Sequence, residues 1–143
     1  MSDTPISLAS LMTASKTVAI DFPGYTGMEV SLCYLAREAL LKLRKRCTTT
    51  KFDKKTRQPE ESLDEDKFIV EYCKAVIKGW SGLKYRYLEE LLLVDIGALD
   101  PEDELPYTQD NAELLMKNSN IFDGWVTEAV GDLENFTGSK LKE

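Results

Sequence analysis

The side chains of this chain that could do chemistry are three cysteines and scattered carboxylates, because the sequence contains no histidine. Cys33, Cys47 and Cys73 lie far apart and form no CxxC pair. That spacing excludes the usual Cys/His zinc sites and argues against a disulfide framework. We expect three reduced thiols that are mostly buried and serve as small hydrophobic side chains.

The acidic segment Asp100–Glu104 is the nearest approach to a calcium loop. An EF-hand loop starting there would need glycine at its sixth position and glutamate at its twelfth, but the chain has Leu105 and Asn111. The neighbouring Glu89 and Glu90 diverge by about 100° on a helix, so they cannot face one reacting atom. The phosphate-loop, GxGxxG, GxSxG and HExxH motifs are absent. The sequence therefore predicts no enzyme, no metal site and no cofactor.

Length and composition predict one folded domain. The chain has 143 residues, of which 43% are hydrophobic and 30% are charged, enough apolar material for one core. It has no run of roughly 18 apolar residues, so no membrane span is expected. The N-terminus lacks the basic start and long apolar stretch of a secretory signal, which favours a cytoplasmic location.

Charge is distributed unevenly along the chain. Residues 29–58 carry nine basic and three acidic side chains, a net charge of +6, whereas residues 59–143 carry eight basic and twenty acidic ones, a net charge of −12. This pattern is typical either of two solvated faces that partly neutralise each other or of a basic segment that binds an acidic partner. Nucleic acid is a poorer candidate, because the acidic remainder would repel phosphates.

Hydrophobic periodicity predicts the elements that must position these side chains. Residues 1–15 are expected to hold a short helix or an arm, and alternation over 16–34 predicts an antiparallel β-hairpin with a glycine-rich turn. Apolar residues spaced by four and three predict a basic helix over 35–47. The charged segment 48–61 is expected to be an exposed loop.

Helical signals dominate residues 62–138. Ser62 begins a sequence that fits a capping box, and Gly79 lies where a left-handed helix stop belongs. Between them a broad helical stripe comprises Phe68, Ile69, Tyr72, Cys73, Val76 and Ile77. Trp80 extends this stripe just past Gly79. Leucine and glutamate favour a helix over 85–94, although Lys84–Tyr87 alone would suit a strand.

Two further helices are expected near the C-terminus. Thr108 can cap the first, and Gly138 is expected to end the second, with 139–143 frayed. The apolar stripe of the last helix comprises Phe122, Trp125, Val126, Ala129, Val130 and Leu133. Together these elements predict an α+β, mainly helical fold, in which an N-terminal antiparallel β-hairpin packs against four to five helices in a single domain.

The most prominent aromatic cluster supplies a candidate binding surface. Trp80, Tyr85 and Tyr87 suit either half-buried core positions or a protein interface, because both environments favour these residue types. In the second case, Trp80, Tyr87 and Leu91 would line a surface groove that holds a partner helix.

The basic helix offers a second candidate surface. Lys42, Lys45 and Arg46 could dock an acidic neighbour, including the acidic portion of a second copy of the chain. Self-association is therefore a secondary expectation.

Four segments carry a family resemblance through their order and spacing. They are Tyr34–Thr48 after the hairpin, Lys78–Leu83, Leu105–Met116 and Trp125–Phe136. Together they resemble the tail assembly chaperones of long, non-contractile-tailed bacteriophages, the functional relatives of the lambda minor tail protein that is made with a frameshifted partner. The resemblance covers roughly residues 17–137.

This resemblance implies a binding role in the host cytoplasm. Such chaperones are thought to coat the tape measure protein, keep it soluble and bring tail tube subunits to it, and they are absent from the finished virion. The implied partners are the tape measure protein, the tail tube protein and a longer frameshifted form of the chain itself. The family has no catalytic residues to carry over.

Two alternatives remain open. A small phage regulatory or host-interaction protein could bind nucleic acid or an acidic partner through its basic segment 37–57. A structural tail subunit would instead be found in purified virions.

Overall fold

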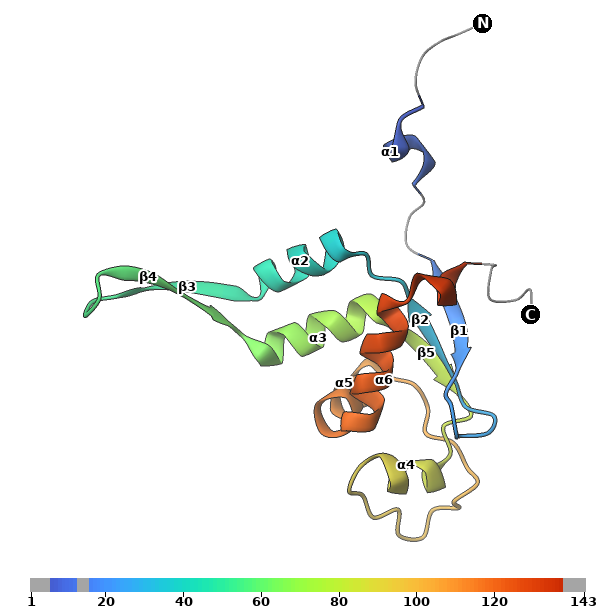
Figure 1. Ribbon diagram of the computed structural model, residues 1–143. Helices are drawn as coiled ribbons and strands as arrows, with labels where there is room; N and C mark the ends of the chain where they lie inside the picture. Colours follow the sequence, from blue (N-terminus) through green and yellow to red (C-terminus); the bar gives the residue numbers. More distant parts are fainter. Residues whose placement is uncertain (1–5, 13–15, 138–143) are drawn as a thin grey trace, which may run out of the picture.

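The computed structural model describes residues 6–12 and 16–137. Within these ranges the chain has the predicted α+β fold, with six α-helices and two small antiparallel sheets (Figure 1). The helices are α1 (Leu8–Leu11), α2 (Arg37–Arg46), α3 (Glu65–Val76), α4 (Tyr85–Leu91), α5 (Gln109–Asn118) and α6 (Asn120–Gly131), followed by a 3-10 helix, η1 (Leu133–Phe136). The strands are β1 (Thr17–Asp21), β2 (Glu29–Cys33), β3 (Thr48–Asp53), β4 (Gln58–Leu63) and β5 (Ile77–Ser81).

The larger sheet has three antiparallel strands in the order β1-β2-β5. The pairing of β1 with β2 confirms the predicted hairpin, with Ile20 opposite Val30. Its connection turns through Gly24 and Gly27, both at positive φ. β5 occupies the other edge of β2, where Trp80 lies opposite Val30.

The prediction that Gly79 ends a helix is wrong, because Gly79 lies inside β5. Helix α3 ends at Val76, and the backbone is already extended at Ile77, with φ −102° and ψ 117°. Ile77 and Trp80 continue the apolar spacing of α3 only by coincidence, since pairing with β2 buries one and half-buries the other.

The segment 48–61, predicted to be a loop, is exposed but regular. β3 and β4 pair from Thr48↔Leu63 to Asp53↔Gln58 and form a ribbon that projects from the ends of α2 and α3 (Figure 1). We call residues 48–63 the arm. The threonine run favours extended backbone, and Lys51 lies opposite Glu60, so a cross-strand pair of opposite charge supports the register.

The predicted capping box at Ser62 is also wrong, because Ser62 pairs with Thr49 inside the arm. The N-cap of α3 is Asp64, whose Oδ1 accepts a hydrogen bond of 3.1 Å from the Lys67 backbone N–H. Aspartate serves the N-cap position as well as serine does.

The C-terminal helices follow the prediction more closely. Thr108 caps α5, and its Oγ1 accepts from the Asn111 N–H. The buried Ser119 ends α5 and caps α6 through its hydroxyl. The last helix stops at Gly131, earlier than predicted, and Leu133 is 54% exposed in η1 while Phe136 is buried. Gly138 lies outside the described residues.

The core lies between the three-stranded sheet and helices α3, α5 and α6. Phe122 of α6 is fully buried, and its ring centroid lies 6.1 Å from that of Phe22 and 6.3 Å from that of Trp80. The short helix predicted near the N-terminus is present as α1, but Leu8 and Leu11 are exposed and belong to no part of this core.

Substitution of Gly82 should destabilise the fold strongly. Gly82 has a φ of +72°, and a Cβ added there would lie 1.9 Å from the carbonyl oxygen of Gly27. We expect Gly82→Ala to lower the free energy of unfolding by about 3 kcal/mol or more, from backbone strain and this clash. Gly24→Ala is the control, because Gly24 has a similar φ of +87° but open space around it. If urea denaturation gave the same decrease in the free energy of unfolding for Gly82→Ala and Gly24→Ala, this explanation would be contradicted.

Candidate partner-binding surfaces

The structure places Trp80 within the body of the fold rather than on a surface groove. Its indole is half-buried in β5, and Nε1–H donates a 2.9 Å hydrogen bond to the carbonyl oxygen of Leu105. The ring packs edge-on against Tyr107 with centroids 5.0 Å apart. Trp80 therefore ties the connection between α4 and α5 to the sheet.

Tyr87 and Leu91 are buried, with 3% and 4% of their surface exposed, so the surface groove predicted for them is wrong. The Tyr87 hydroxyl donates a 2.5 Å hydrogen bond to the carbonyl of Thr26, and its ring meets Tyr25 edge-on. Tyr85 is half-buried at the start of the same helix. Tyr87 therefore holds α4 against the β1–β2 turn. The sequence alone could not separate the two roles, because core and interface favour the same side-chain types.

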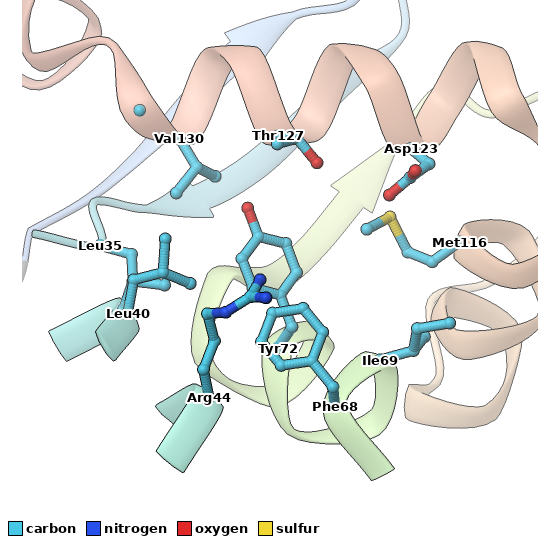
Figure 2. Close-up of a pocket in the computed structure, with 11 residues that line it drawn as sticks. Leu35, Leu40, Arg44, Phe68, Ile69, Tyr72, Met116, Asp123, Thr127 and Val130 are labelled. Atoms are coloured by element: carbon cyan, nitrogen blue, oxygen red, sulfur yellow. The ribbon is translucent and has the colours of Figure 1, made fainter. Parts of the chain in front are cut away.

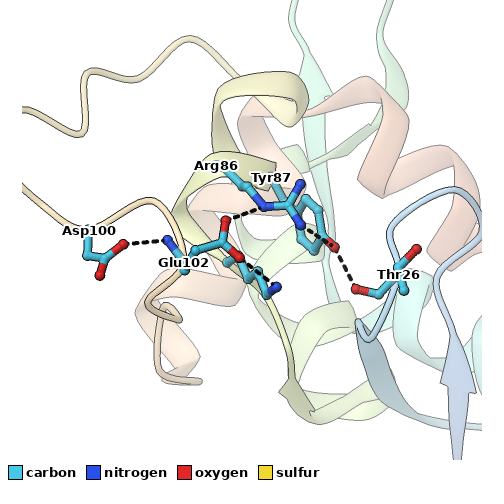
Figure 3. A network of polar contacts seen from close by, with 6 residues as sticks. Thr26, Arg86, Tyr87, Asp100 and Glu102 are labelled. Carbon is cyan, nitrogen blue, oxygen red and sulfur yellow. Dashed lines mark hydrogen bonds and ion pairs between the residues drawn. The ribbon is translucent and has the colours of Figure 1, made fainter.

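A polar network fixes α4 from its outer side (Figure 3). Glu102 Oε2 lies 2.7 Å from Arg86 Nε, and its other carboxylate oxygen lies 2.9 Å from Lys84 Nζ. The Arg86 guanidinium carbon also lies 4.6 Å from the centroid of the Tyr87 ring. The hydrogen bond from Lys84 is the main cause that lowers the pKa of Glu102; desolvation opposes it, and the positive charge of Arg86 adds to it. These ion pairs offset the charge of the Glu102 carboxylate and hold the loop that contains Glu102 against α4.

An apolar groove lies elsewhere, between α2, α3 and α6 (Figure 2). It has a cavity volume of about 210 Å³. We call it the α2–α3–α6 groove. Its lining residues are Leu35, Leu40, Arg44, Phe68, Ile69, Tyr72, Met116, Asp123, Thr127, Val130 and Gly131.

Two charged side chains of opposite sign, those of Arg44 and Asp123, line this groove. The Arg44 guanidinium lies 5.5 Å from the Phe68 ring centroid, and Asp123 lies on the α6 side (Figure 2). Phe68 stacks on Tyr72 with centroids 5.6 Å apart. Burial raises the pKa of the Tyr72 phenol, which also lines the groove.

The apolar stripe of α3 is the sequence signal for this groove, although its spacing alone predicts only core packing. Phe68 and Ile69 begin the broad apolar stripe of α3, and both remain half-buried in the structure. Because pairs of adjacent apolar residues make this stripe broad, two neighbouring helices are needed to bury it. Helices α2 and α6 bury the first turn of the stripe only partly.

The basic residues of α2, predicted as a second binding surface, lie together on one surface. Lys42, Lys45 and Arg46 are exposed on α2 and border a shallow depression. Lys42 Nζ lies 3.2 Å from the Glu38 carboxylate. Leu40 and Arg44 of the same helix line the α2–α3–α6 groove, whereas Lys42, Lys45 and Arg46 lie on the opposite face of α2, away from the groove.

Other kinds of site have little support in the described residues. No group of three or more histidine, cysteine or acidic side chains there could hold a metal ion. Across the same residues, every helix is too short or too polar to span a membrane. Comparison with protein-family models, with curated proteins and with solved structures gives no match for this chain. Its function must be argued from the surfaces themselves.

The cysteines should be chemically inert in the folded protein. Cys33, Cys47 and Cys73 are all free and buried, and burial, helped by the charges of Glu113 and Asp123, raises the pKa of Cys73 to about 12. Only about one Cys73 thiol in 10,000 would be ionised at pH 8, and the thiolate is the reactive form. An aromatic disulfide reagent should therefore titrate none of the three rapidly in the native state and all three in denaturant. Rapid labelling of the native protein would contradict this burial.

Proposed function

We propose that the protein is a phage tail assembly chaperone. It binds the tape measure protein in the host cytoplasm, keeps it soluble, helps to recruit tail tube subunits and is absent from the mature virion. It catalyses no reaction, and it acts as one domain in which the N-terminal hairpin packs against the helices. The observation that carries the proposal is the α2–α3–α6 groove.

The size and chemistry of the groove suit a side chain from a partner helix. Its volume of about 210 Å³ is below the roughly 300 Å³ from which small-molecule sites start. Its walls are mainly apolar, and Arg44 and Asp123 provide one charge of each sign. An amphipathic helix docks in such a groove through apolar anchors at helical spacing.

A tape measure protein is a long helical polymer whose apolar stripes would associate if left bare. One copy of the chaperone would cover one or two apolar side chains, so many copies would act along the polymer. Weak, repeated contacts of this kind allow later displacement by tube subunits. Arg44 at the groove would meet acidic residues that flank each anchor, and the surface of Lys42, Lys45 and Arg46 on the opposite face of α2 stays available to an acidic neighbour.

Two neighbouring leucines of α2 provide a matched test. Leu40 is half-buried and lines the groove, whereas Leu41 is 55% exposed and lies outside its lining. Leu40→Glu should weaken binding to the tape measure protein of the same phage at least tenfold, because a carboxylate replaces an apolar wall. Co-expression followed by measurement of the soluble tape measure protein gives the readout.

Leu41→Glu is the control, because it makes the same change of charge and of helix propensity on the same helix. Thermal unfolding of both variants establishes that they are folded. Equal solubilisation by Leu40→Glu and Leu41→Glu would exclude the groove as the binding site. Failure of the unaltered protein to keep the tape measure protein soluble would reject the chaperone function.

A regulator that binds nucleic acid is the second candidate, since Lys42, Lys45 and Arg46 share one exposed surface. In that case a labelled DNA duplex should bind with an affinity that falls steeply between about 50 and 200 mM salt. Reversal of these three charges should abolish the binding and leave the unfolding temperature nearly unchanged. Fluorescence anisotropy that detects no binding at low salt would remove this candidate.

A further inference from the structure

The arm is a regular element that is held at its base and exposed along its length. Thr48 Oγ1 donates a 2.8 Å hydrogen bond to the carbonyl oxygen of Arg44, which ties the start of β3 to the last turn of α2. Beyond this base, every residue from Thr49 to Ser62 is exposed except Asp53, which is half-buried. Figure 1 shows the arm extending beyond the ends of α2 and α3.

The turn at the tip of the arm satisfies its own backbone. Asp53 Oδ1 accepts a 2.8 Å hydrogen bond from the Lys55 N–H, and the Asp53 carbonyl oxygen accepts one of 2.7 Å from the Arg57 N–H. The backbone at Arg57 takes the left-handed conformation that closes the turn, with φ 58°. The carboxylate of Asp53 is therefore occupied within the turn.

The two outer edges of the arm differ in how they are protected. The ribbon has two strands, so each strand has one edge with no neighbouring strand in the described part of the chain. On β4, Pro59 removes a backbone donor from the outer edge, since a ladder tolerates proline where its nitrogen faces away from the partner strand. Glu60 and Glu61 add charge beside it, and both devices are typical of protected edges.

The edge of β3 carries less protection. Its sequence, Thr-Thr-Thr-Lys-Phe-Asp, contains no proline and is rich in residues that favour extended backbone. Its outward-facing N–H and C=O groups can therefore pair with a further strand. An isolated two-stranded ribbon is only marginally stable in water, and a third strand would stabilise it.

The side chains of β3 indicate what kind of strand would fit beside it. Because side chains alternate between the two faces of a ribbon, Thr50 and Phe52 share one face, and Thr49 and Lys51 share the other. The Phe52 side chain is 65% exposed. Neighbouring strands pair best with opposite charges and with apolar groups side by side. The matching segment therefore carries a carboxylate beside Lys51 and an apolar side chain beside Phe52.

Positive charge at the tip strengthens the preference for an acidic segment. Lys54, Lys55 and Arg57 lie in or beside the turn and are exposed. Neither these three side chains nor Lys51 form an ion pair within the described residues. Their field would attract a carboxylate-bearing segment towards the β3 edge.

We propose that the β3 edge of the arm binds an extended acidic segment of another protein, which adds to the ribbon as a third strand. Backbone hydrogen bonds along β3 supply the binding, and Lys51 and Phe52 select the side chains of the segment. The site is separate from the α2–α3–α6 groove, so the proposal stands independently of what that groove binds.

Two other occupants fit the β3 edge less well. Pairing of β3 with β3 of a second copy would bring like charges together, because Lys51 and the basic tip are present in both. A nucleic acid would meet Glu60 and Glu61 on the same ribbon, and these carboxylates repel phosphates. An acidic segment of a different protein avoids both conflicts.

A peptide of alternating valine and glutamate is the probe, with about six residues to match a typical strand. One of its faces then offers glutamate to Lys51 and the other offers valine to Phe52. The labelled peptide should bind the unaltered protein by fluorescence anisotropy in about 50 mM salt. A peptide of alternating valine and lysine is the control and should not bind.

Exchange of one cross-strand pair supplies the matched variant. Lys51→Glu with Glu60→Lys keeps opposite charges across the ribbon and leaves the net charge unchanged, but moves the lysine from β3 to β4. It should bind the valine–glutamate peptide about tenfold more weakly, because a carboxylate now lies beside the glutamates of the peptide. Cross-strand nuclear Overhauser effects establish that the ribbon of the variant is still paired.

Hydrogen exchange measured by NMR locates the contact. In the unaltered protein the outward-facing amides of β3 should exchange rapidly, and saturation with the peptide should slow them. The outward-facing amides of β4 should keep their exchange rates. Protection of β4 instead, or of neither strand, would overturn the proposal.

The remaining outcomes also decide the question. The proposal fails if the valine–glutamate peptide does not bind, if the valine–lysine peptide binds equally well, or if the exchanged pair leaves binding undiminished. Protection of β3 that rises with protein concentration without peptide would assign the edge to a second copy. Tighter binding of a thymidine oligonucleotide than of the peptide would assign it to nucleic acid. Either assignment would overturn the proposal.

Discussion

The pairing of β5 with β2 is the constraint on which the rest of the structure depends. It joins the N-terminal hairpin to the helical portion, because Trp80 lies opposite Val30 and Ile77 opposite Leu32. Phe122 of α6 then closes over this junction from the helical side. Without the pairing, the hairpin would keep only its packing contacts with the helices. With it, one continuous apolar core extends from the sheet to α3, α5 and α6.

Sequence patterns located most elements but not the topology that joins them. Alternation and helical spacing predicted the first hairpin and helices α2 to α6, because those signals are local. The strand β5 was missed because Trp80 sits at a helical spacing from the α3 stripe, and only the distant partner Val30 makes that backbone extended. The arm was missed for a related reason, since charged strands without a buried face lack apolar alternation. Of the candidate site residues, Lys42, Lys45 and Arg46 are exposed, whereas Tyr87 and Leu91 are buried. Burial of Tyr87 depends on a turn far away in the sequence.

The proposed function therefore rests on surfaces that the fold leaves partly uncovered. The α2–α3–α6 groove exists because α2 and α6 do not meet over the first turn of α3, so Phe68 and Ile69 remain half covered. The pronounced separation of charge along the chain becomes a separation in space, because the basic α2 and the acidic stretch of residues 89–104 around and after α4 lie in different places.

The arm has one more consequence, which follows from where it starts and finishes. Thr48 and Leu63 are direct partners in the ladder, so the chain leaves and rejoins the main body at nearly the same point. The main body would thus accept a tight two-residue turn in place of the whole ribbon. The length and composition of the arm can therefore change during evolution without disturbing α2 or α3. Relatives are therefore expected to differ most in this ribbon, and a fluorescent or affinity tag inserted at its tip should leave the fold undisturbed.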